Sequence, residues 1–340
     1  MTEENKVASI AGKVLGERTG EVKTYSPDVL VPVPRNLSIE YLGVKMEDLE
    51  GAGFDLWYSY EFRTLTTNGL PVASVIKFII PHTTKNIIES KSFKLYCNGF
   101  TTERLGDTKE EALKKACEIM KKDLSKAAEG DVEVSIVDGS VREAVFEDYV
   151  ELTTLVDPKI EVKIYNETPD LLEVEDTDEV KTYRLKFDAL RSTCRITHQP
   201  DSGSFYLYYQ SKKHIKEESL VRYFSSFYEE HHFHEEILVT AFTRLEKLLN
   251  PEDSLFTTAL YQRRGSLDIG PCHYKNMDLN SKEEDIICNL ITSTRWRTES
   301  SAPTSWDSLF SVSQLKFTAS SGSAPVLSRL SMSALSCTSR

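Results

Sequence analysis

One eight-position pattern occurs twice in the chain and constrains its fold more than any other feature. Residues 89–96 are Glu-Ser-Lys-Ser-Phe-Lys-Leu-Tyr, and residues 201–208 are Asp-Ser-Gly-Ser-Phe-Tyr-Leu-Tyr. In each copy a carboxylate opens a turn before an alternating, strand-like segment, and a helical pattern follows. The repeat predicts two related α+β halves in which Glu89 and Asp201 occupy equivalent positions. The alternative is a chance match in a short window.

Other periodic segments favour the same fold class. A run rich in Val and Ile at 72–80 predicts a strand. Capping-box spacing from Thr108 opens an amphipathic pattern that predicts a helix ending before Gly130. The three- and four-residue spacing of apolar residues predicts two more helices, at 220–228 and 237–249.

Composition divides the chain into parts. Residues 166–180 contain seven acidic residues and no basic one, which is typical of a solvated connector. We therefore predict an N-terminal module at 1–165 and a C-terminal module at 181–276. Residues 277–340 are expected to form a disordered tail, because Ser supplies 14 of the last 41 residues.

The charge balance argues against a nucleic-acid partner. Lys and Arg number 41 against 53 Asp and Glu, and the net charge of -12 has the wrong sign for binding a phosphate backbone. We expect a small-molecule ligand and no direct contact with nucleic acid. No run approaches the roughly 18 apolar residues of a membrane helix, so no membrane contact is expected. The first residues lack the features of a targeting signal, which favours a cytoplasmic location.

A thiol, an imidazole and a carboxylate occur close together around Cys194. A cysteine becomes a nucleophile when nearby positive charge or a base stabilises its thiolate, and Arg191, Arg195 and His198 are candidates for that role. Asp201, on the far side of a turn, is placed to act as a general acid. The alternative is a buried structural cysteine beside a hydrogen-bonded histidine.

A second cluster opens the last predicted helix. His231, His232 and His234 invite a metal interpretation, but they lack ligand spacing and a companion Cys pair, so no metal site is predicted. Phe233 could stack on a planar ligand while Glu235 accepts hydrogen bonds from a guanine-like edge. The alternative is a solvated helix N-terminus, where the helix dipole favours Glu in any case.

A third cluster contains Arg263, Arg264 and Gly265 at the end of a β-prone run. Paired arginines and a glycine suit the binding of phosphates, although they are equally compatible with a basic turn. The chain has no Gly-x-Gly-x-x-Gly fingerprint and no P-loop. A nucleotide cofactor is therefore not expected to bind in the Rossmann or Walker manner.

Together these clusters resemble the QueF family, the NADPH-dependent 7-cyano-7-deazaguanine reductases of queuosine biosynthesis, a tRNA modification. The motifs at 88–96, 193–204, 233–235 and 263–269 follow the order of the family's longer, two-module branch. The resemblance implies two tandem tunnelling-fold modules, with antiparallel sheets backed by helices, that assemble as a homodimer.

The resemblance also implies the chemistry. The family reduces a nitrile to a primary amine with two NADPH through a covalent thioimide. Cys194 would add to the nitrile carbon, Asp201 would protonate the nitrogen, and His234 would assist the proton transfer. Substrate contacts are implied at Glu89, Ser90, Phe233 and Glu235. Cofactor contacts are implied at Lys91, Ser92, Lys94, Arg263, Arg264 and Gly265.

The sequence departs from the family after Ile269, where the usual Asn-Pro and short basic end are replaced by an acidic insert and the Ser-rich tail. This end is either an unusual extension or a misassembled gene model. Alternative functions are a deazapurine-binding protein without reductase activity, an amidinotransferase or a cyclohydrolase. The last needs metal ligands that the chain does not show convincingly, and the amidinotransferase acts on tRNA, which suits an acidic chain poorly.

Overall fold

The computed structural model describes residue 9 and residues 24–40, 43–46, 49, 51–137, 146–195, 198–261 and 267–277. These residues belong to one compact unit, Met1–Ala302. The predicted cofactor contacts Arg263, Arg264 and Gly265 lie outside the described residues, as does the predicted tail beyond Met277.

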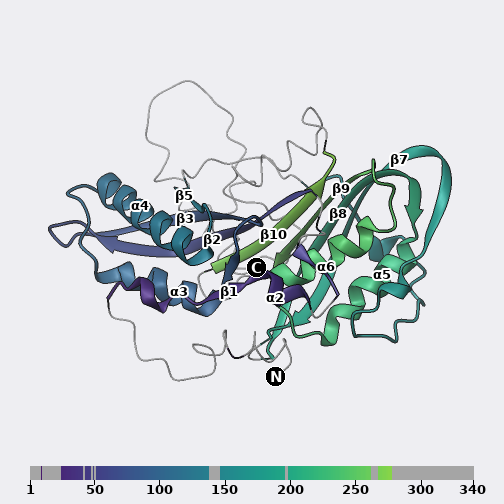
Figure 1. Cartoon of the computed structure of the whole chain (residues 1–340), viewed down its shortest axis with the longest axis horizontal. Coiled ribbons are helices and arrows are strands. Elements are labelled where there is room, and N and C mark those ends of the chain that lie inside the picture. Colours follow the sequence, from purple (N-terminus) through teal and green to yellow (C-terminus); the bar gives the residue numbers. More distant parts are fainter. Residues whose placement is uncertain are drawn as a thin grey trace, which may run out of the picture. The chain divides into compact units, whose positions relative to one another are not determined.

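One eight-stranded sheet forms the centre of this unit, with the strand order β5-β3-β2-β10-β9-β8-β7-β6, and β1 pairs with β4 in a separate two-stranded sheet (Figure 1). All pairings are antiparallel except the short parallel pairing of β6 with β7. The strands span Pro32–Pro34 (β1), Ala52–Leu65 (β2), Pro71–Pro81 (β3), Asn86–Ile88 (β4), Glu133–Ile136 (β5), Val150–Glu151 (β6), Val174–Thr193 (β7), Pro200–Ile215 (β8), Ser254–Tyr261 (β9) and Leu267–Lys275 (β10).

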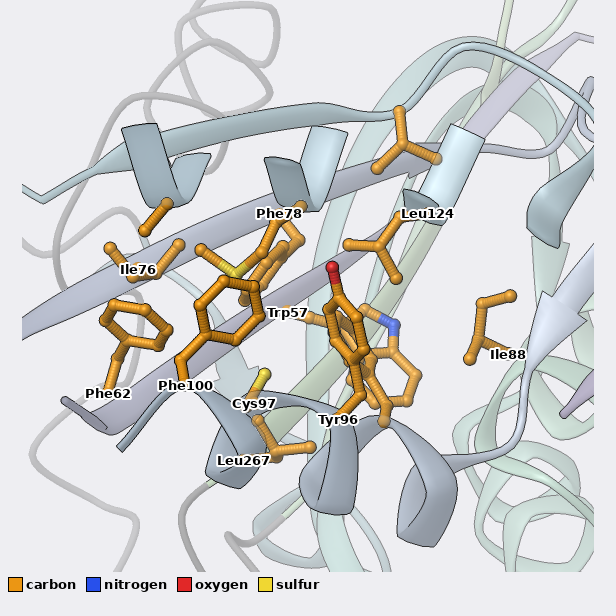
Figure 2. Close-up of a cluster of buried hydrophobic side chains, with 14 of the residues drawn as sticks. Trp57, Phe62, Ile76, Phe78, Ile88, Tyr96, Cys97, Phe100, Leu124 and Leu267 are labelled. Carbon is orange, nitrogen blue, oxygen red and sulfur yellow. The ribbon is translucent and has the colours of Figure 1, made fainter. Parts of the chain in front are cut away.

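The helices pack on one face of the large sheet. They span Arg35–Ile39 (α2), Ser90–Gly99 (α3), Lys109–Ala128 (α4), Glu217–Ser225 (α5) and His234–Glu246 (α6). Trp57 and Phe78 of the sheet meet Tyr96 of α3 and Leu124 of α4 in one core cluster (Figure 2). Within the described residues, no helix has the length and apolar character that crossing a bilayer requires.

A second core cluster lies under α5 and α6. Leu207 of β8 packs there with Phe224 of α5 and Phe242 of α6. Because side chains alternate along a strand, the register of the sheet places this cluster on the same face as the first. The α+β prediction is therefore confirmed, with antiparallel strands backed by helices on one side.

The predicted elements are confirmed, with shifted ends. The strand expected at 72–80 is β3, the helix expected before Gly130 is α4, and the last two helices are α5 and α6. The hydroxyl of Thr108 accepts a hydrogen bond from the Glu111 N–H at 3.2 Å and so caps α4.

The prediction that the two pattern copies occupy equivalent positions is wrong. The copy at 89–96 forms the start of α3, whereas the copy at 201–208 lies within β8. The second copy is bordered by β7 and β9, which satisfy its backbone hydrogen bonds on both sides. It also has Gly203 and Tyr206 where the first copy has Lys91 and Lys94, so it lacks two good helix formers.

The acidic segment at 166–180 is only partly a connector. It contains a short 3-10 turn at Pro169–Leu171, and β7 begins at Val174 and pairs with the far end of β8. The acidic side chains stay at the surface of this strand, where Asp176 lies 3.0 Å from the Lys213 ammonium. The proposed division at residue 165 stays a prediction. The pairing of β10 with β2 joins strands from the two halves in one sheet.

Candidate active site

Cys194 lies directly after β7, in the turn that leads to β8. Its N–H donates to the Gln199 carbonyl at 2.8 Å, and its carbonyl accepts from the His198 N–H at 2.9 Å. His198 has a φ of +54°, and this left-handed conformation helps the chain to reverse direction. The turn leaves the Cys194 thiol free and only half-buried.

Strand register brings Asp201 to the same hairpin end. Thr193 pairs with Pro200, and Ser192 pairs with Asp201. Cross-strand partners point to the same face of a sheet, so the Ser192 and Asp201 side chains lie together on the helix-covered face. Cys194 lies two positions after Ser192, so the hairpin brings the predicted nucleophile and the predicted acid to the same end of the sheet.

His234 joins them as the first residue of α6. Its Nε2 lies 3.4 Å from Oδ2 of Asp201, and its ring stacks on Tyr261 with 3.8 Å between centroids. Tyr261 pairs with Gly203, where an added Cβ would come within 2.9 Å of the Tyr261 Cα. A glycine is therefore required for β9 to approach β8 closely at this point.

Tyr261 is a site residue that the sequence analysis missed. Its side chain is buried, and burial, followed by the charges of Asp201 and Glu235, raises its pKa well above the usual value. The phenol therefore stays neutral and acts as a support for the His234 ring. A tyrosine before the paired arginines was visible in the sequence, but nothing in it indicated the pairing with Gly203.

Phe233 and Glu235 face the N-terminal half. Phe233 packs against Val33 of β1 and Ile87 of β4, and Ile87 lies two residues before Glu89. Glu235 is only 7% exposed, and burial, followed by the negative charge of Asp55, raises its pKa to about 8. The start of α6 and the segment before α3 thus meet at one junction.

Glu89 is the N-cap of α3. Its Oε1 accepts from the Lys91 N–H at 2.8 Å and its Oε2 from the Ser92 N–H at 2.7 Å. Burial raises the Glu89 pKa, against the opposing effect of these two hydrogen bonds. Each oxygen retains a second lone pair, so a fixed carboxylate remains able to accept a ligand N–H. Ser90 is exposed, with its hydroxyl 3.5 Å from Oε1 of Glu89.

The implied cofactor residues on α3 differ in their surroundings. Lys91 is exposed and Lys94 is half-buried, and their spacing places both ammonium groups on one side of the helix. Ser92 is fully buried, and its hydroxyl donates to the Glu89 carbonyl at 2.6 Å and accepts from the Val31 N–H at 3.1 Å. These bonds hold the turn together, and the cofactor contact implied at Ser92 stays a prediction.

The charges that were candidates for activating the thiol have other partners. Arg191 donates to the Tyr228 carbonyl, and Arg195 forms an ion pair with Glu236. His198 lies against the ring of His231, with 4.0 Å between centroids. Arg195 is nevertheless the cation adjacent to Cys194 in the chain.

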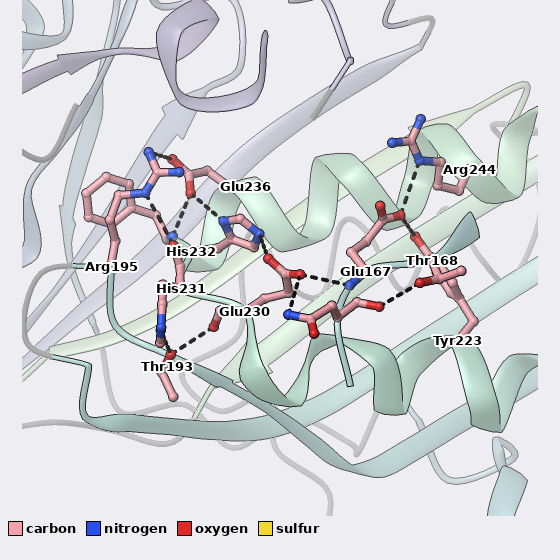
Figure 3. Close-up of polar contacts among 12 residues, drawn as sticks. Glu167, Thr168, Thr193, Arg195, Tyr223, Glu230, His231, His232, Glu236 and Arg244 are labelled. Carbon is pink, nitrogen blue, oxygen red and sulfur yellow. Dashed lines mark hydrogen bonds and ion pairs between the residues drawn. The ribbon is translucent and has the colours of Figure 1, made fainter. Parts of the chain in front are cut away.

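The three clustered histidines have three different partners. His231 contacts the Thr193 hydroxyl and His232 lies 2.8 Å from Glu230 (Figure 3), whereas His234 faces Asp201. Their rings therefore do not converge on a common point. Across the described ranges, no group of three His, Cys, Asp or Glu side chains is arranged to hold a metal ion.

A buried ionic network that the sequence analysis missed acts on Glu235. Asp55 lies 2.6 Å from Arg35 and 2.9 Å from His82, and His82 lies 3.0 Å from His273. Burial alone would raise the Asp55 pKa, but Arg35 and His82 outweigh it and lower the value to about 2. The one signal in the sequence was a carboxylate inside the otherwise apolar stretch Phe54–Tyr58.

Comparison with protein families matches both halves of the chain. A family described as nitrile reductase, 7-cyano-7-deazaguanine-reductase N-term, matches residues 22–136. A second family, described as QueF-like protein, matches residues 200–278. Together the two matches cover more than half of the sequence, and Cys194 lies between them.

Proposed function

Because the chain belongs to the QueF family of nitrile reductases, we propose that it reduces 7-cyano-7-deazaguanine to 7-aminomethyl-7-deazaguanine with NADPH. The antiparallel strands backed by helices agree with the tunnelling fold of that family. The observation that supports the proposal is the hairpin end where Cys194 follows β7 and Asp201 enters β8, with His234 3.4 Å from Asp201.

The proposed reaction begins with covalent capture. The Cys194 thiolate adds to the nitrile carbon, one π bond of the nitrile breaks, and Asp201 gives a proton to the nitrogen. The product is a thioimide on Cys194. His234, 3.4 Å from Asp201, is placed to pass protons to and from that carboxyl group. Covalent capture divides a difficult four-electron reduction into easier steps.

Substrate recognition in this proposal uses the junction between the halves. Phe233 packs on the deazaguanine ring, and carboxyl oxygens of Glu89 and Glu235 accept hydrogen bonds from its N–H groups. Both side chains are buried, so a ring without matching donors would lose these hydrogen bonds and bind poorly. Ser90, at the surface beside Glu89, completes the proposed contacts.

The cofactor would be held by the α3 lysines. Lys91 and Lys94 carry two positive charges on one side of α3, and positive side chains suit the phosphates of NADPH. When bound, NADPH supplies the hydrides that reduce the captured nitrile to the amine. Arg263, Arg264 and Gly265 remain predicted contacts, and by the same resemblance we propose that the enzyme acts as a homodimer in the cytoplasm.

The proposal is tested by following NADPH oxidation in the presence of 7-cyano-7-deazaguanine. Reduction of a nitrile to an amine takes four electrons, so two NADPH should be consumed per nitrile. Cys194→Ala should abolish the consumption. A wild-type protein that binds the nitrile but oxidises no NADPH would instead be a deazapurine-binding protein.

A further inference from the structure

A buried ion pair connects the Cys194 turn to the helix that carries the other site residues. Arg195 follows Cys194 directly, and its Nη1 lies 3.3 Å from Oε1 of Glu236 in the first turn of α6 (Figure 3). The side chains are 3% and 0% exposed. Two charges are thus removed from water at the point where the turn meets the helix.

Both members of this pair also hold Phe233. The second oxygen of Glu236 accepts a hydrogen bond from the Phe233 N–H at 2.8 Å. The Arg195 guanidinium lies over the Phe233 ring, 5.7 Å from its centroid, and its Nε donates to the His231 carbonyl at 3.4 Å. The pair therefore fixes the segment that precedes His234 as well as the turn itself.

The surrounding contacts make this connection rigid. The Thr193 N–H donates to the Glu230 carbonyl at 2.9 Å, and the His232 N–H donates to the Thr193 carbonyl at 3.1 Å. His232 lies between Glu230, at 2.8 Å, and Glu236, at 3.6 Å. Backbone bonds thus join the end of β7 to the segment before α6, and the Arg195–Glu236 pair continues the connection past Cys194.

We infer that Arg195 and Glu236 are positioning residues, which hold the Cys194 thiol in register with Asp201 and His234 for attack on the nitrile. The inference rests on the proposed function. A buried ion pair is a weak source of stability compared with apolar side chains of the same size, so geometry is the better explanation for this one. Reacting groups must be held within a fraction of an ångström, and a misplacement of about 1 Å can cost roughly 100-fold in rate.

The decisive experiment removes both charges together. Arg195→Met with Glu236→Gln leaves no unpaired buried charge, so its melting temperature should exceed that of Arg195→Met alone. The rate of thioimide formation without NADPH, at saturating nitrile, should still fall about 100-fold. A double variant that forms the thioimide at the wild-type rate would overturn the inference.

A second Arg–Glu pair on α6 is the matched control. Arg244 lies 3.2 Å from Glu167 at the other end of the helix, with side chains that are 14% and 7% exposed (Figure 3). Arg244→Met with Glu167→Gln should lower the melting temperature while leaving the rate of thioimide formation within about twofold. An equal loss of rate in this control would show that the Arg195–Glu236 effect is only structural.

Two further measurements keep the test independent. Arg195→Lys retains the charge but not the planar guanidinium, so the variant should fold normally and form the thioimide about 10-fold more slowly. A wild-type rate in this folded variant contradicts the inference.

Alkylation of Cys194 by iodoacetamide should accelerate in the double variant, with half-buried Cys117 on α4 as the internal reference. If wild-type protein captures no nitrile, the proposed function fails, and an unchanged alkylation rate then overturns the positioning role as well.

Discussion

The two copies of the eight-position pattern fold differently and place their carboxylates in different chemistry. Glu89 caps α3, and both of its oxygens accept hydrogen bonds from backbone amides of that helix. Asp201 enters β8 and faces the His234 imidazole. A carboxylate held by amides is fixed as an acceptor, whereas one beside an imidazole can exchange protons. Strand pairing on both sides of the second copy, together with its loss of two helix-forming lysines, therefore separates the roles of the two carboxylates.

The largest expected effect is at Asp201. Asp201→Asn keeps the size of the side chain but removes the proton donor, so thioimide formation should slow by about 10²- to 10⁴-fold. The rate is measured from the appearance of the adduct without NADPH. Glu89→Gln, assayed at saturating nitrile, should leave this rate nearly unchanged. Equal losses in the two variants would erase the distinction between the copies.

Glu235 shows what a buried carboxylate does beside another negative charge. Its pKa is raised from 4.5 to about 8, so the folded state holds its proton more tightly than the unfolded state. Stability should therefore fall as the pH rises from about 5 to 8. The Glu235→Gln variant does not lose stability in this way. At pH 8 its free energy of unfolding should exceed that of the wild type by a few kcal/mol, since one pKa unit is worth about 1.4 kcal/mol.

Urea unfolding of both proteins at pH 5 and pH 8 measures this difference. Substrate affinity should fall in the same variant, because Gln presents an amide where the ring N–H groups need acceptors. A stability difference that does not grow with pH would contradict the assignment of the raised pKa to Glu235.

A smaller effect is expected from the cap at Glu89. Glu89→Ala should destabilise the protein by about 1 kcal/mol through the loss of the α3 cap, and it should also weaken binding of 7-cyano-7-deazaguanine. Thr108→Ala, at the cap of α4, is the control and should lose similar stability with no change in affinity. If Glu89→Ala bound the nitrile as tightly as Thr108→Ala does, Glu89 would cap α3 without contacting the substrate.

The smallest effect is expected at Lys91. Because Lys91 is exposed, Lys91→Ala should raise the KM for NADPH only about threefold, as expected for a solvated ion pair. Thioimide formation, which needs no cofactor, should not change. A slower adduct in this variant would place Lys91 in substrate binding instead.

Sequence analysis located the residues whose roles depend on local order along the chain. The Cys194 turn and the start of α6 each lie within a few consecutive residues, so their candidate residues could be named from the sequence, and the roles given to them stay predictions. Tyr261 and the pairing of Arg195 with Glu236 were not visible, because they arise where separate elements come together. The network around Asp55 was missed for the same reason.

The most direct test of the account is to locate the covalent adduct. Wild-type protein is mixed with 7-cyano-7-deazaguanine without NADPH, and the intact mass and the modified peptide are determined by mass spectrometry. The account predicts one adduct per chain, on Cys194, that is lost in Cys194→Ala. No adduct, or an adduct on another cysteine such as Cys117, would contradict the assignment of Cys194 as the nucleophile.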